Sequence, residues 1–292
     1  MNILLTNHDL AQYGGTQTWL CDMAHTLSAR GHTVDVMCFV GGVIEDKLDV
    51  RQIFISKYPE ADYDLILVNH NTCMNVLKSH SAFKIYTQHG PQHNAEQYLG
   101  GADAVVAVTP EVKLALAYKG VTSTVISNGV DLNVFSDAQS DPQVDILNLC
   151  KGTRGQDMIC EAADTLGLSC QSIHYETSPQ DDVATPMQGA RVVVGYGRCI
   201  IEALAVGCGA FVFDARGEEE PRGDGWITNE NVNICSRHGF NGRTSLKFYT
   251  QKDLDWDLEQ PKWPPKGWSK RHANIEDKVD QYLALVGEEV PV

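Results

Sequence analysis

The chain has 292 residues, of which 43% are hydrophobic and 21% are charged, values that fit an ordinary globular protein of about two domains. Its 23 Lys and Arg against 38 Asp and Glu give a formal net charge of -15 at pH 7. This excess of negative charge opposes general attraction to nucleic-acid phosphates or anionic lipids, and it excludes a broadly basic binding protein.

The first residues, MNILLTNHDL, contain a short apolar run but lack the basic start and small-residue cleavage site of a signal peptide, so they predict a first strand. No stretch approaches the ~18 uninterrupted apolar residues of a transmembrane helix. The nine cysteines are scattered and form no CxxC pair. This usage favours buried thiols in a reducing cytoplasm over a disulfide framework or a zinc site.

Short apolar runs alternate with segments of helical periodicity along the whole chain. The apolar runs predict strands over residues 3–5, 34–40, 65–68, 84–86, 104–108, 124–126, 145–149, 170–173, 191–194 and 210–213. Helical spacing of apolar residues predicts helices over 19–27, 111–119, 156–166, 200–206 and 274–286. Strands that alternate with helices predict an α/β protein with parallel, doubly wound sheets.

A polar stretch, SDAQSDPQ over residues 136–143, interrupts this pattern before it restarts. We therefore expect a domain boundary near residue 140, with an N-terminal domain over 1–140 and a C-terminal domain over 141–273. The segment 217–242 has little periodicity and predicts loops with one short strand. The amphipathic helix near the end, within 274–292, is a candidate to cross back to the first domain.

The first strand-to-helix loop contains a pair of glycines, Gly14 and Gly15, with Thr16 in position to cap the helix that follows. Paired glycines let backbone N–H groups approach a ligand closely, and a helix N-terminus attracts phosphate or another polar group. The same residues also fit a simple tight turn. The loop is not G-x-G-x-x-G, so the dinucleotide fingerprint is absent.

Two blocks in the first half carry a specific resemblance. The segment GGTQTWLCDMAHTLSARGHTVDV resembles the opening of retaining GT-B glycosyltransferases of family 4, in which a Gly-Gly loop precedes a helix ending in Arg-Gly-His. The segment 102–135 resembles the family's run to an Asn-Gly-Val-Asp-x-x-x-Phe signature, carried here by Asn128, Gly129, Val130, Asp131 and Phe135. The resemblance implies a GT-B fold, with two Rossmann-like domains facing across a cleft, and metal-independent sugar transfer.

A third block, VVVGYGRCIIEALAVGCGAFVFDA, is similar to the family's donor-binding segment. The resemblance places the loop Gly195, Tyr196 and Gly197 beside the donor, and makes Glu202 a contact to the ribose hydroxyls, which an ionised carboxylate can accept. Val194 stands where the family has a first glutamate that approaches the donor sugar. A pentose or deoxy-sugar donor is one consequence of this change.

The segment ILNLCKGTRGQDMICEAADTLG resembles, more loosely, the start of the family's second domain. Lys151 and Arg154 are the candidates to neutralise the donor diphosphate, since two fixed cations and helix amides stabilise a departing diphosphate without a metal. Their spacing is shorter than in the family, and two exposed loop cations are the alternative.

Histidines in the first half complete the expected site. His89, in TQHGPQHN, follows a strand where the family has an active-site histidine, so His89 joins Lys151 and Arg154 as a catalytic candidate. Gly15 belongs to the donor side by the same resemblance. His8 lines the first loop, and with Gly14 and Thr16 it belongs to the acceptor side. His70 and His93 lie in similar loops with weaker support.

We expect no metal site. Asp-x-Asp strings occur at Asp62 and Asp64 and again in DLDWD at 253–257, but neither follows a strand of the expected donor site. The expected substrate is a nucleotide-sugar, most simply a UDP-sugar, and no cofactor is expected.

The acceptor is open between several classes. Residues 1–140 hold eight Lys and Arg, too few for the basic surface of relatives that act on membrane lipids, so a saccharide or metabolite fits better. A DNA acceptor is the second possibility, as in virus-encoded enzymes that glycosylate hydroxylated DNA bases. A nucleotide-sugar epimerase, or a binding protein that has lost catalysis, is the alternative outside glycosyl transfer.

Overall fold

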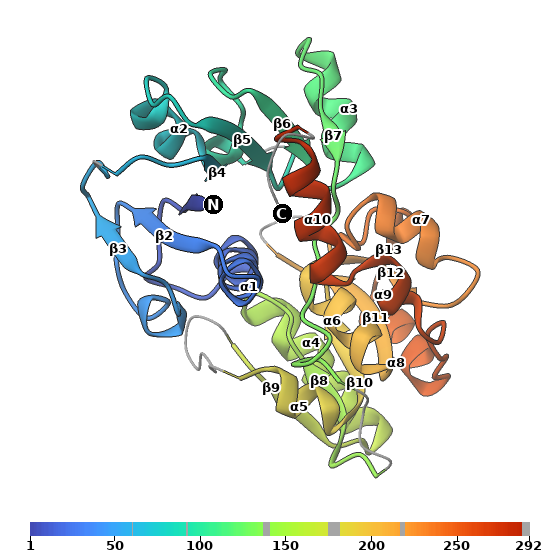
Figure 1. Ribbon diagram of the computed structural model, residues 1–292. Helices are drawn as coiled ribbons and strands as arrows, with labels where there is room; N and C mark the ends of the chain where they lie inside the picture. Colours follow the sequence, from blue (N-terminus) through green and yellow to red (C-terminus); the bar gives the residue numbers. More distant parts are fainter. Residues whose placement is uncertain (60, 92, 137–140, 175–181, 217–219, 288–292) are drawn as a thin grey trace. The chain divides into compact units, whose positions relative to one another are not determined.

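Figure 1 shows the computed structural model, which describes residues 1–59, 61–91, 93–136, 141–174, 182–216 and 220–287. By its internal contacts the chain divides into two compact units. Unit 1 consists of Met1–Gly129 and Ile275–Val292, and unit 2 consists of Val130–Asn274. Each unit is a Rossmann-like α/β domain with its own sheet.

Unit 1 is built on a seven-stranded sheet in the order β3-β2-β1-β4-β5-β6-β7, all parallel. Its strands are β1 (Asn2–Thr6), β2 (Thr33–Cys38), β3 (Gln52–Ile55), β4 (Leu65–Asn69), β5 (Phe83–Gln88), β6 (Ala104–Ala107) and β7 (Thr124–Val125). Its helices are α1 (Gly15–Ala29), α2 (Asn71–Leu77), α3 (Pro110–Tyr118) and α10 (Ile275–Ala284), with 3-10 turns η1 (Glu45–Lys47) and η2 (Asn94–Glu96).

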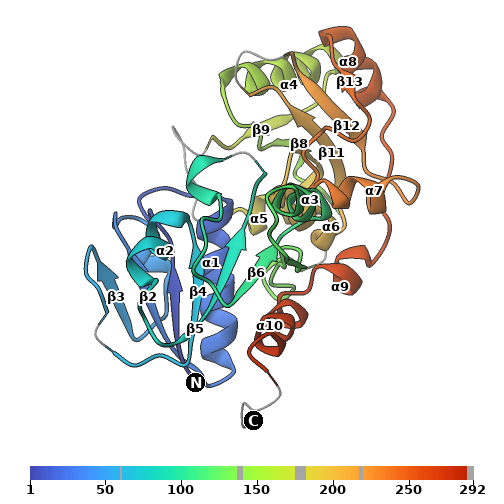
Figure 2. The same cartoon turned by 90° about the horizontal axis from the view of Figure 1, so that it is seen from above.

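The sheet of unit 1 is covered on both faces, which explains why its central strands read as unbroken apolar runs. Ile3, Leu5 and Leu67 pack with α1 and α10 in one core cluster, and Leu4 and Ile66 pack with α2 in another. Figure 2 shows α1 and α2 on opposite sides of the strands. Alternate residues of β1 and β4 thus face different cores.

Unit 2 is built on a six-stranded sheet in the order β13-β12-β11-β10-β8-β9. Strands β8 (Val144–Asn148), β9 (Cys170–Ser172), β10 (Ala190–Gly195) and β11 (Gly209–Asp214) are parallel, whereas β12 (Arg222–Trp226) and β13 (Lys247–Phe248) extend the sheet in antiparallel fashion. The helices are α4 (Thr153–Leu166), α5 (Ala184–Gln188), α6 (Arg198–Val206), α7 (Val232–Arg237), α8 (Gln251–Glu259) and α9 (Trp268–His272).

Each sheet has one point at which the direction of winding reverses. In unit 1, β1 and β4 are neighbours, with β2 and β3 on one side and β5 to β7 on the other. In unit 2, β8 and β10 are neighbours, with β9 on one side and β11 on the other. Ligands of open α/β sheets bind at the carboxyl ends of the strands at such a switch point. The loops after β1 and β4, and after β8 and β10, are therefore the places to look for function.

The division between the units falls between Gly129 and Val130, ahead of the boundary expected near residue 140. The physical reason is that Val130 and Phe135, which precede the polar stretch 136–143, are already buried in the core of unit 2. Residues 137–140 lie outside the described part of the chain.

The final helix, α10, belongs to unit 1. Tyr282 packs edge-on against Trp19 of α1, with ring centroids 5.8 Å apart, and its hydroxyl lies 3.0 Å from that of Thr87 in β5. Arg30, at the end of α1, forms ion pairs with Glu276 and Asp280. The helix therefore completes one face of the first sheet.

The segment 217–242 contains more regular structure than its composition predicts. In addition to the expected strand, which is β12, it contains α7, a short helix whose Val232 and Cys235 are buried. A helix of six residues with three apolar positions, one of them exposed, is too short to reveal helical periodicity in the sequence. In the described ranges, no helix combines the length and the apolar character needed to cross a membrane.

Candidate functional site

The switch point of unit 2 brings two helix N-termini together at adjacent strands. Helix α4 follows β8 and α6 follows β10, and these strands are hydrogen-bonded neighbours. Both helices begin after a glycine with a positive φ, 83° at Gly152 and 72° at Gly197, and neither has a side-chain cap. A helix N-terminus without a side-chain cap is an arrangement suited to an anion.

The two loops lie close together. A Cβ atom at Gly195 would lie 3.5 Å from Cβ of Leu149, in ordinary contact with the other loop, and 2.7 Å from Sγ of Cys199, so a larger residue there would have to displace the Cys199 side chain. Burial raises the pKa of the Cys199 thiol to about 12, while Lys151 is near enough to oppose that shift. The structure therefore brings the predicted residues Lys151 and Gly195 together. Arg154 is exposed in the first turn of α4.

Glu202 is buried in the second turn of α6, where it is only 5% exposed. Its Oε1 atom accepts a hydrogen bond of 2.7 Å from Nε of Arg198, one turn earlier in the helix. The sequence analysis did not identify Arg198, although an arginine four residues before a glutamate is the spacing at which helical side chains meet. The ion pair compensates the burial of the Glu202 carboxylate and fixes its orientation.

Tyr196 supports a further cation at the same edge of the sheet. The guanidinium of Arg216 lies 3.8 Å from the centroid of the Tyr196 ring, and it donates two hydrogen bonds, of 2.9 and 2.8 Å, to the carboxylate of Asp214. Asp214 is the last residue of β11. The Arg216 side chain remains 45% exposed. Sequence reasoning missed this pair because the resemblance gives Asp214 no role and Arg216 lies just beyond the resembling segment.

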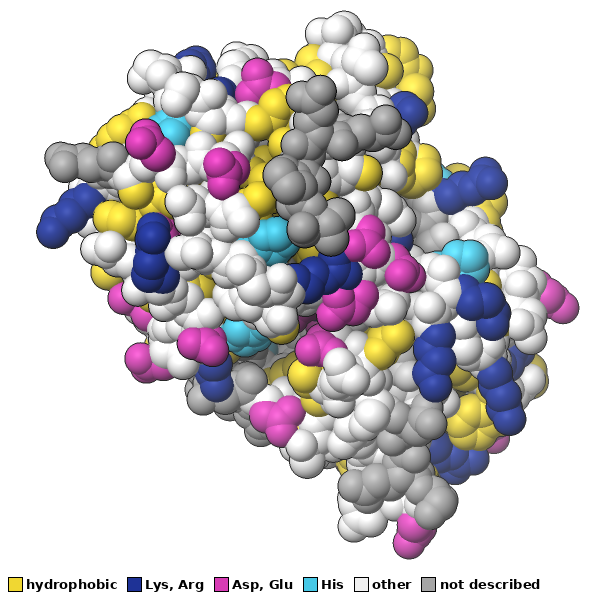
Figure 3. All heavy atoms as spheres, viewed as in Figure 1, with side chains coloured by type: hydrophobic (Ala, Val, Ile, Leu, Met, Phe, Trp, Pro, Cys, Tyr) yellow, Lys and Arg dark blue, Asp and Glu magenta, His cyan; other side chains and the backbone are white. Residues whose placement is uncertain are grey.

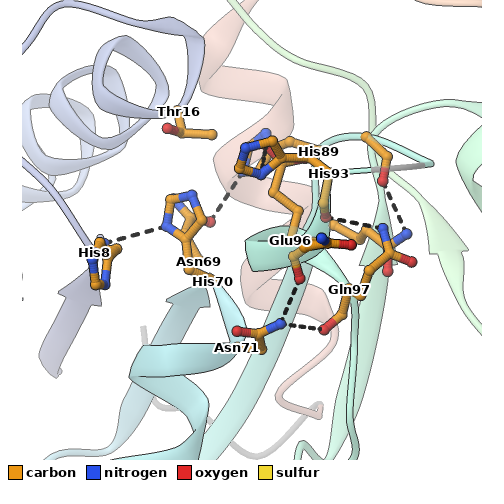
Figure 4. A network of polar contacts seen from close by, with 12 residues as sticks. His8, Thr16, Asn69, His70, Asn71, His89, His93, Glu96 and Gln97 are labelled. Carbon is orange, nitrogen blue, oxygen red and sulfur yellow. Dashed lines mark hydrogen bonds and ion pairs between the residues drawn. The ribbon is translucent and has the colours of Figure 1, made fainter.

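The switch point of unit 1 carries a cluster of histidine and asparagine side chains (Figure 4). His8 follows β1, and its backbone N–H donates to Nδ1 of His70, which follows β4, over 3.3 Å. Asn69 is the last residue of β4, and its Oδ1 lies 3.0 Å from Nε2 of His89, which follows β5. Three adjacent parallel strands thus present imidazoles at one edge.

Two asparagines in this region retain hydrogen-bond donors that the protein does not use. Asn7 and Asn69 are both 0% exposed, and within the described chain the Nδ2 atom of each has no hydrogen-bond partner. A buried donor without a partner is costly, so such atoms are rare unless a ligand or water satisfies them. Asn7 directly follows β1 and Asn69 is the last residue of β4, and these are the two strands of the switch point.

His70 is held uncharged. Burial lowers its pKa to about 4, with further lowering by His8 and His93, while Asp9 acts in the opposite direction. Because its Nδ1 accepts from the backbone of His8, its proton resides on Nε2. The backbone φ of 70° is unusual for a residue other than glycine, and it marks this position as one where local strain is tolerated.

The loop after β5 is tied to the cluster by Asn71, at the start of α2. Its Nδ2 atom donates to the carbonyl oxygens of Asn94, over 2.7 Å, and Gln97, over 3.2 Å. This loop also carries His93, whose Nδ1 lies 3.8 Å from Oε1 of Glu96. Burial raises the pKa of the Glu96 carboxyl, and His93 opposes this shift.

The expected cap at the start of α1 is wrong. Gly14 occupies the N-cap position, without a side-chain cap, and Thr16 lies inside the helix, where its hydroxyl donates to Oε1 of Gln17 over 3.0 Å. The prediction failed because threonine is a common N-cap residue and Thr16 directly follows the glycine pair, whereas the helix already begins at Gly15. A Cβ atom at Gly15 would meet nothing within 4 Å, so open space adjoins the helix start.

The Asp-x-Asp strings have structural partners. Asp64 accepts a hydrogen bond from the backbone of Asn2, and Asp253 forms a capping box with Thr250 at the start of α8. Asp257 accepts from Lys247 and Tyr249. In the part of the chain that the structure describes, no group of three His, Cys, Asp or Glu is arranged to hold a metal ion.

No protein-family model and no curated protein sequence matches the chain. Solved structures do match. A glycosyltransferase from Rickettsia africae ESF-5 superposes with a TM-score of 0.58 at 13% identity, over 98% of this chain and 97% of that one. An alpha-glucosyltransferase in complex with UDP and a 13-mer DNA containing an HMU base gives 0.57 at 11% identity, over 98% and 99%.

A third structure, TarM, gives a TM-score of 0.57 at 10% identity, over 98% of this chain and 99% of that chain. Because each superposition covers nearly the whole of both chains, these matches establish the fold. Because the sequence identities are low, they establish the fold alone. The protein has two Rossmann-like α/β domains that match structures of the GT-B class.

Proposed function

We propose that the protein is a glycosyltransferase that moves a sugar from a nucleotide-sugar to an acceptor hydroxyl, with retention of configuration and without a metal ion. The observation that carries this proposal is the pair of uncapped helix N-termini, of α4 and α6, at the switch point of unit 2. Together with the cations Lys151, Arg154 and Arg216 at the same edge, they form a site suited to a diphosphate.

The nucleotide roles follow from the chemistry of each group. The helix amides, Lys151 and Arg154 hold the diphosphate and stabilise the charge that develops on it as the sugar departs. The carboxylate of Glu202, oriented by Arg198, accepts hydrogen bonds from the ribose hydroxyls. The match to a structure that contains UDP supports a UDP-sugar as the donor.

The position of Val194 bears on the donor sugar. Its side chain is 0% exposed and packs in the apolar core cluster that includes Ile159 and Phe213, so it offers no polar group to a ligand. The missing glutamate removes one acceptor for a sugar hydroxyl, and the donor proposed on that ground is a pentose or a deoxy-sugar. We assign His89 and the neutral His70 of unit 1 to the sugar and acceptor hydroxyls, with His8, Gly14 and Thr16 on the acceptor side.

The acceptor proposed is a saccharide or a small metabolite. A DNA acceptor is the alternative that the match to a DNA-bound alpha-glucosyltransferase favours, and the net charge of -15 weighs against it. Both acceptors require the same donor chemistry in unit 2, so the donor can be tested first.

The donor test is a screen of nucleotide-sugars for those that raise the melting temperature, followed by an assay of nucleoside diphosphate release with acceptor pools. A ligand that binds only the folded state must stabilise it. We expect Lys151→Ala and Arg154→Ala to lose the stabilisation, while Lys252→Ala, which removes an exposed cation of α8, retains it. The absence of stabilisation by any nucleotide-sugar would refute the donor site.

The same assays distinguish the other two classes of function. An epimerase would convert one nucleotide-sugar into its epimer without net release of nucleoside diphosphate. A binding protein without catalysis would be stabilised by a nucleotide-sugar and release nothing with any acceptor pool. Either result would support the proposed donor site and would refute the proposed transfer reaction.

A further inference from the structure

Unit 2 contains a second cavity, of about 660 Å³, away from the loops that follow β8 and β10. It lies on the antiparallel extension of the sheet, between the β12–β13 region and α8. Its other walls come from residues 228–231 and from the segment 260–263, which follows α8. Since β11 separates β12 from β10 in the sheet, this cavity is not part of the nucleotide site.

The floor of this cavity is fixed by a network centred on Asp257. The indole Nε1 of Trp226 donates to the Asp257 carbonyl over 2.7 Å. Lys247 Nζ and the Tyr249 hydroxyl both donate to Oδ2 of Asp257, over 2.6 and 2.8 Å. Trp226 also packs edge-on against Phe211 in the core. The cavity is therefore largely formed before any ligand arrives, as is usual for binding sites.

The rim of the cavity carries two indoles that the protein leaves in water. Trp256 is 65% exposed and Trp263 is 56% exposed, whereas Trp226 at the floor is 6% exposed. In Figure 3, hydrophobic side chains lie at the surface where Figure 1 places α8. Exposed large aromatic residues that line one concave surface are characteristic of a binding site, since each offers a flat apolar face with a polar N–H.

The charge of the lining limits the kind of ligand. Asp224, Glu230 and Asp257 line the cavity against two cations, Lys247 and Lys262, and the amides of Asn229, Asn231 and Gln260 complete the polar lining. Figure 3 shows Lys and Arg side chains near the exposed hydrophobic ones on this face of the molecule. A phosphate chain entering the cavity would meet three carboxylates, which disfavours a nucleic acid.

We infer that this cavity binds a neutral saccharide, with sugar rings stacked on Trp256 and Trp263. The apolar faces of pyranose rings match the indoles, and the hydroxyls match the carboxylates and amides, which accept and donate several hydrogen bonds each. The inference is independent of the proposed transfer reaction, because no residue of the cavity belongs to the nucleotide site.

The test uses the full chain and four neutral probes: maltohexaose, cellohexaose, xylohexaose and N-acetylchitohexaose. Binding is followed by tryptophan fluorescence and by saturation-transfer NMR, which reports the sugar protons in contact with the protein. We expect at least one probe to bind at millimolar concentration or below. Loss of one stacked indole should weaken that binding by about tenfold in Trp256→Ala and in Trp263→Ala. Trp256→Phe, which keeps a flat aromatic face, should retain most of it.

The control is Tyr118→Ala, which removes an aromatic side chain that is 84% exposed on α3 of unit 1. It should leave saccharide binding unchanged, and all variants should retain their stabilisation by the nucleotide-sugar. Three results would overturn the inference: no binding of any probe, equal binding by the alanine variants, or binding only of oligodeoxythymidine, which would assign the surface to single-stranded nucleic acid.

Discussion

The Nε2 atom of His89 lies 3.0 Å from Oδ1 of Asn69. A carbonyl oxygen can only accept, so with this amide orientation Nε2 of His89 carries a proton and donates it to Asn69. Asn69 is the last residue of β4 and is completely buried, so its position is fixed by the sheet. The ring of His89 also meets Trp19 edge-on, at 5.4 Å between centroids. The tautomer and the direction of this imidazole are thus set before substrate binds.

The first prediction concerns this imidazole. His89→Ala should lower kcat of the proposed transfer by ~10²-fold, the usual effect of losing one positioned acid–base or hydrogen-bonding group. The stabilisation by nucleoside diphosphate alone should be unchanged, because the proposed contacts to the nucleotide all come from unit 2. His25→Ala, at an exposed position of α1, is the matched control. Normal kcat in His89→Ala would remove this residue from the reaction.

The second prediction separates the structural and binding roles of Glu202. Glu202→Gln alone removes a negative charge from beside the buried Arg198 guanidinium, and should lower the free energy of unfolding by ~3 kcal/mol. The double variant Arg198→Met with Glu202→Leu removes both charges and should recover most of that stability. Nucleotide-sugar affinity should remain at least about tenfold weaker in the double variant. Recovery of affinity together with stability would mean that Glu202 only serves the fold.

The third prediction is a pH dependence of stability. The folded-state pKa of His70 is lowered to about 4 by burial, whereas in the unfolded chain it titrates near ~6.5. Between these values the unfolded state binds more protons, so stability is fully present above pH ~6.5 and is lost as pH falls toward 4. The loss from this residue amounts to as much as ~3 kcal/mol.

His70→Asn tests this pH effect, since asparagine tolerates the positive φ at this position. Urea unfolding at pH 7 and at pH 5 should show a smaller difference in the variant than in the wild type. His8, His93 and Asp9, the titratable groups nearest the ring, are unchanged in it. An equal difference in both proteins would show that His70 is not buried in its neutral form.

The fourth prediction concerns the attachment of α10. Tyr282→Phe removes the hydroxyl that lies 3.0 Å from that of Thr87, which is itself 0% exposed, and should cost about 1 kcal/mol of stability. Tyr282→Ala also empties the space beside Trp19 and should cost ~3–5 kcal/mol. Chemical denaturation followed by far-UV circular dichroism measures both. Equal stability of the alanine variant and the wild type would show that α10 does not pack on α1.

Much of the regular structure can be predicted from the sequence because the buried parallel strands are continuous apolar runs. Residues 65–68 and 191–194 lie within β4 and β10, and the helix expected over 156–166 lies within α4. Strands at the edges of the sheets have weaker apolar patterns in the sequence. β3 was not predicted, although residues 53–55 form a short apolar run; two of its four positions are half-buried and the other two are exposed.

The candidate site could be predicted only where a motif carried it. Lys151 and the Gly195 loop are recognisable because they stand in sequence beside a strand and a helix start. The contacts made by Arg198 and Arg216 depend on which side chains meet in space. The role of Asn69 is similarly hidden, since an asparagine at a strand end has no distinctive neighbours in sequence. The structure identifies Asn69 by the hydrogen bond of its Oδ1 atom with His89 and by its buried Nδ2 donor.

Unit 2 is an insertion within unit 1, because the chain leaves the first domain after Gly129 and re-enters it at Ile275. The two crossings are paired, with the N–H of Val130 donating to the Ala273 carbonyl over 2.7 Å. During synthesis the whole of unit 2 therefore leaves the ribosome before α10 does. Unit 2 can fold while translation continues, whereas the first sheet lacks part of the cover of one apolar face until its last helix arrives. Unit 1 is therefore the part that stays exposed to chaperones and to aggregation for longer.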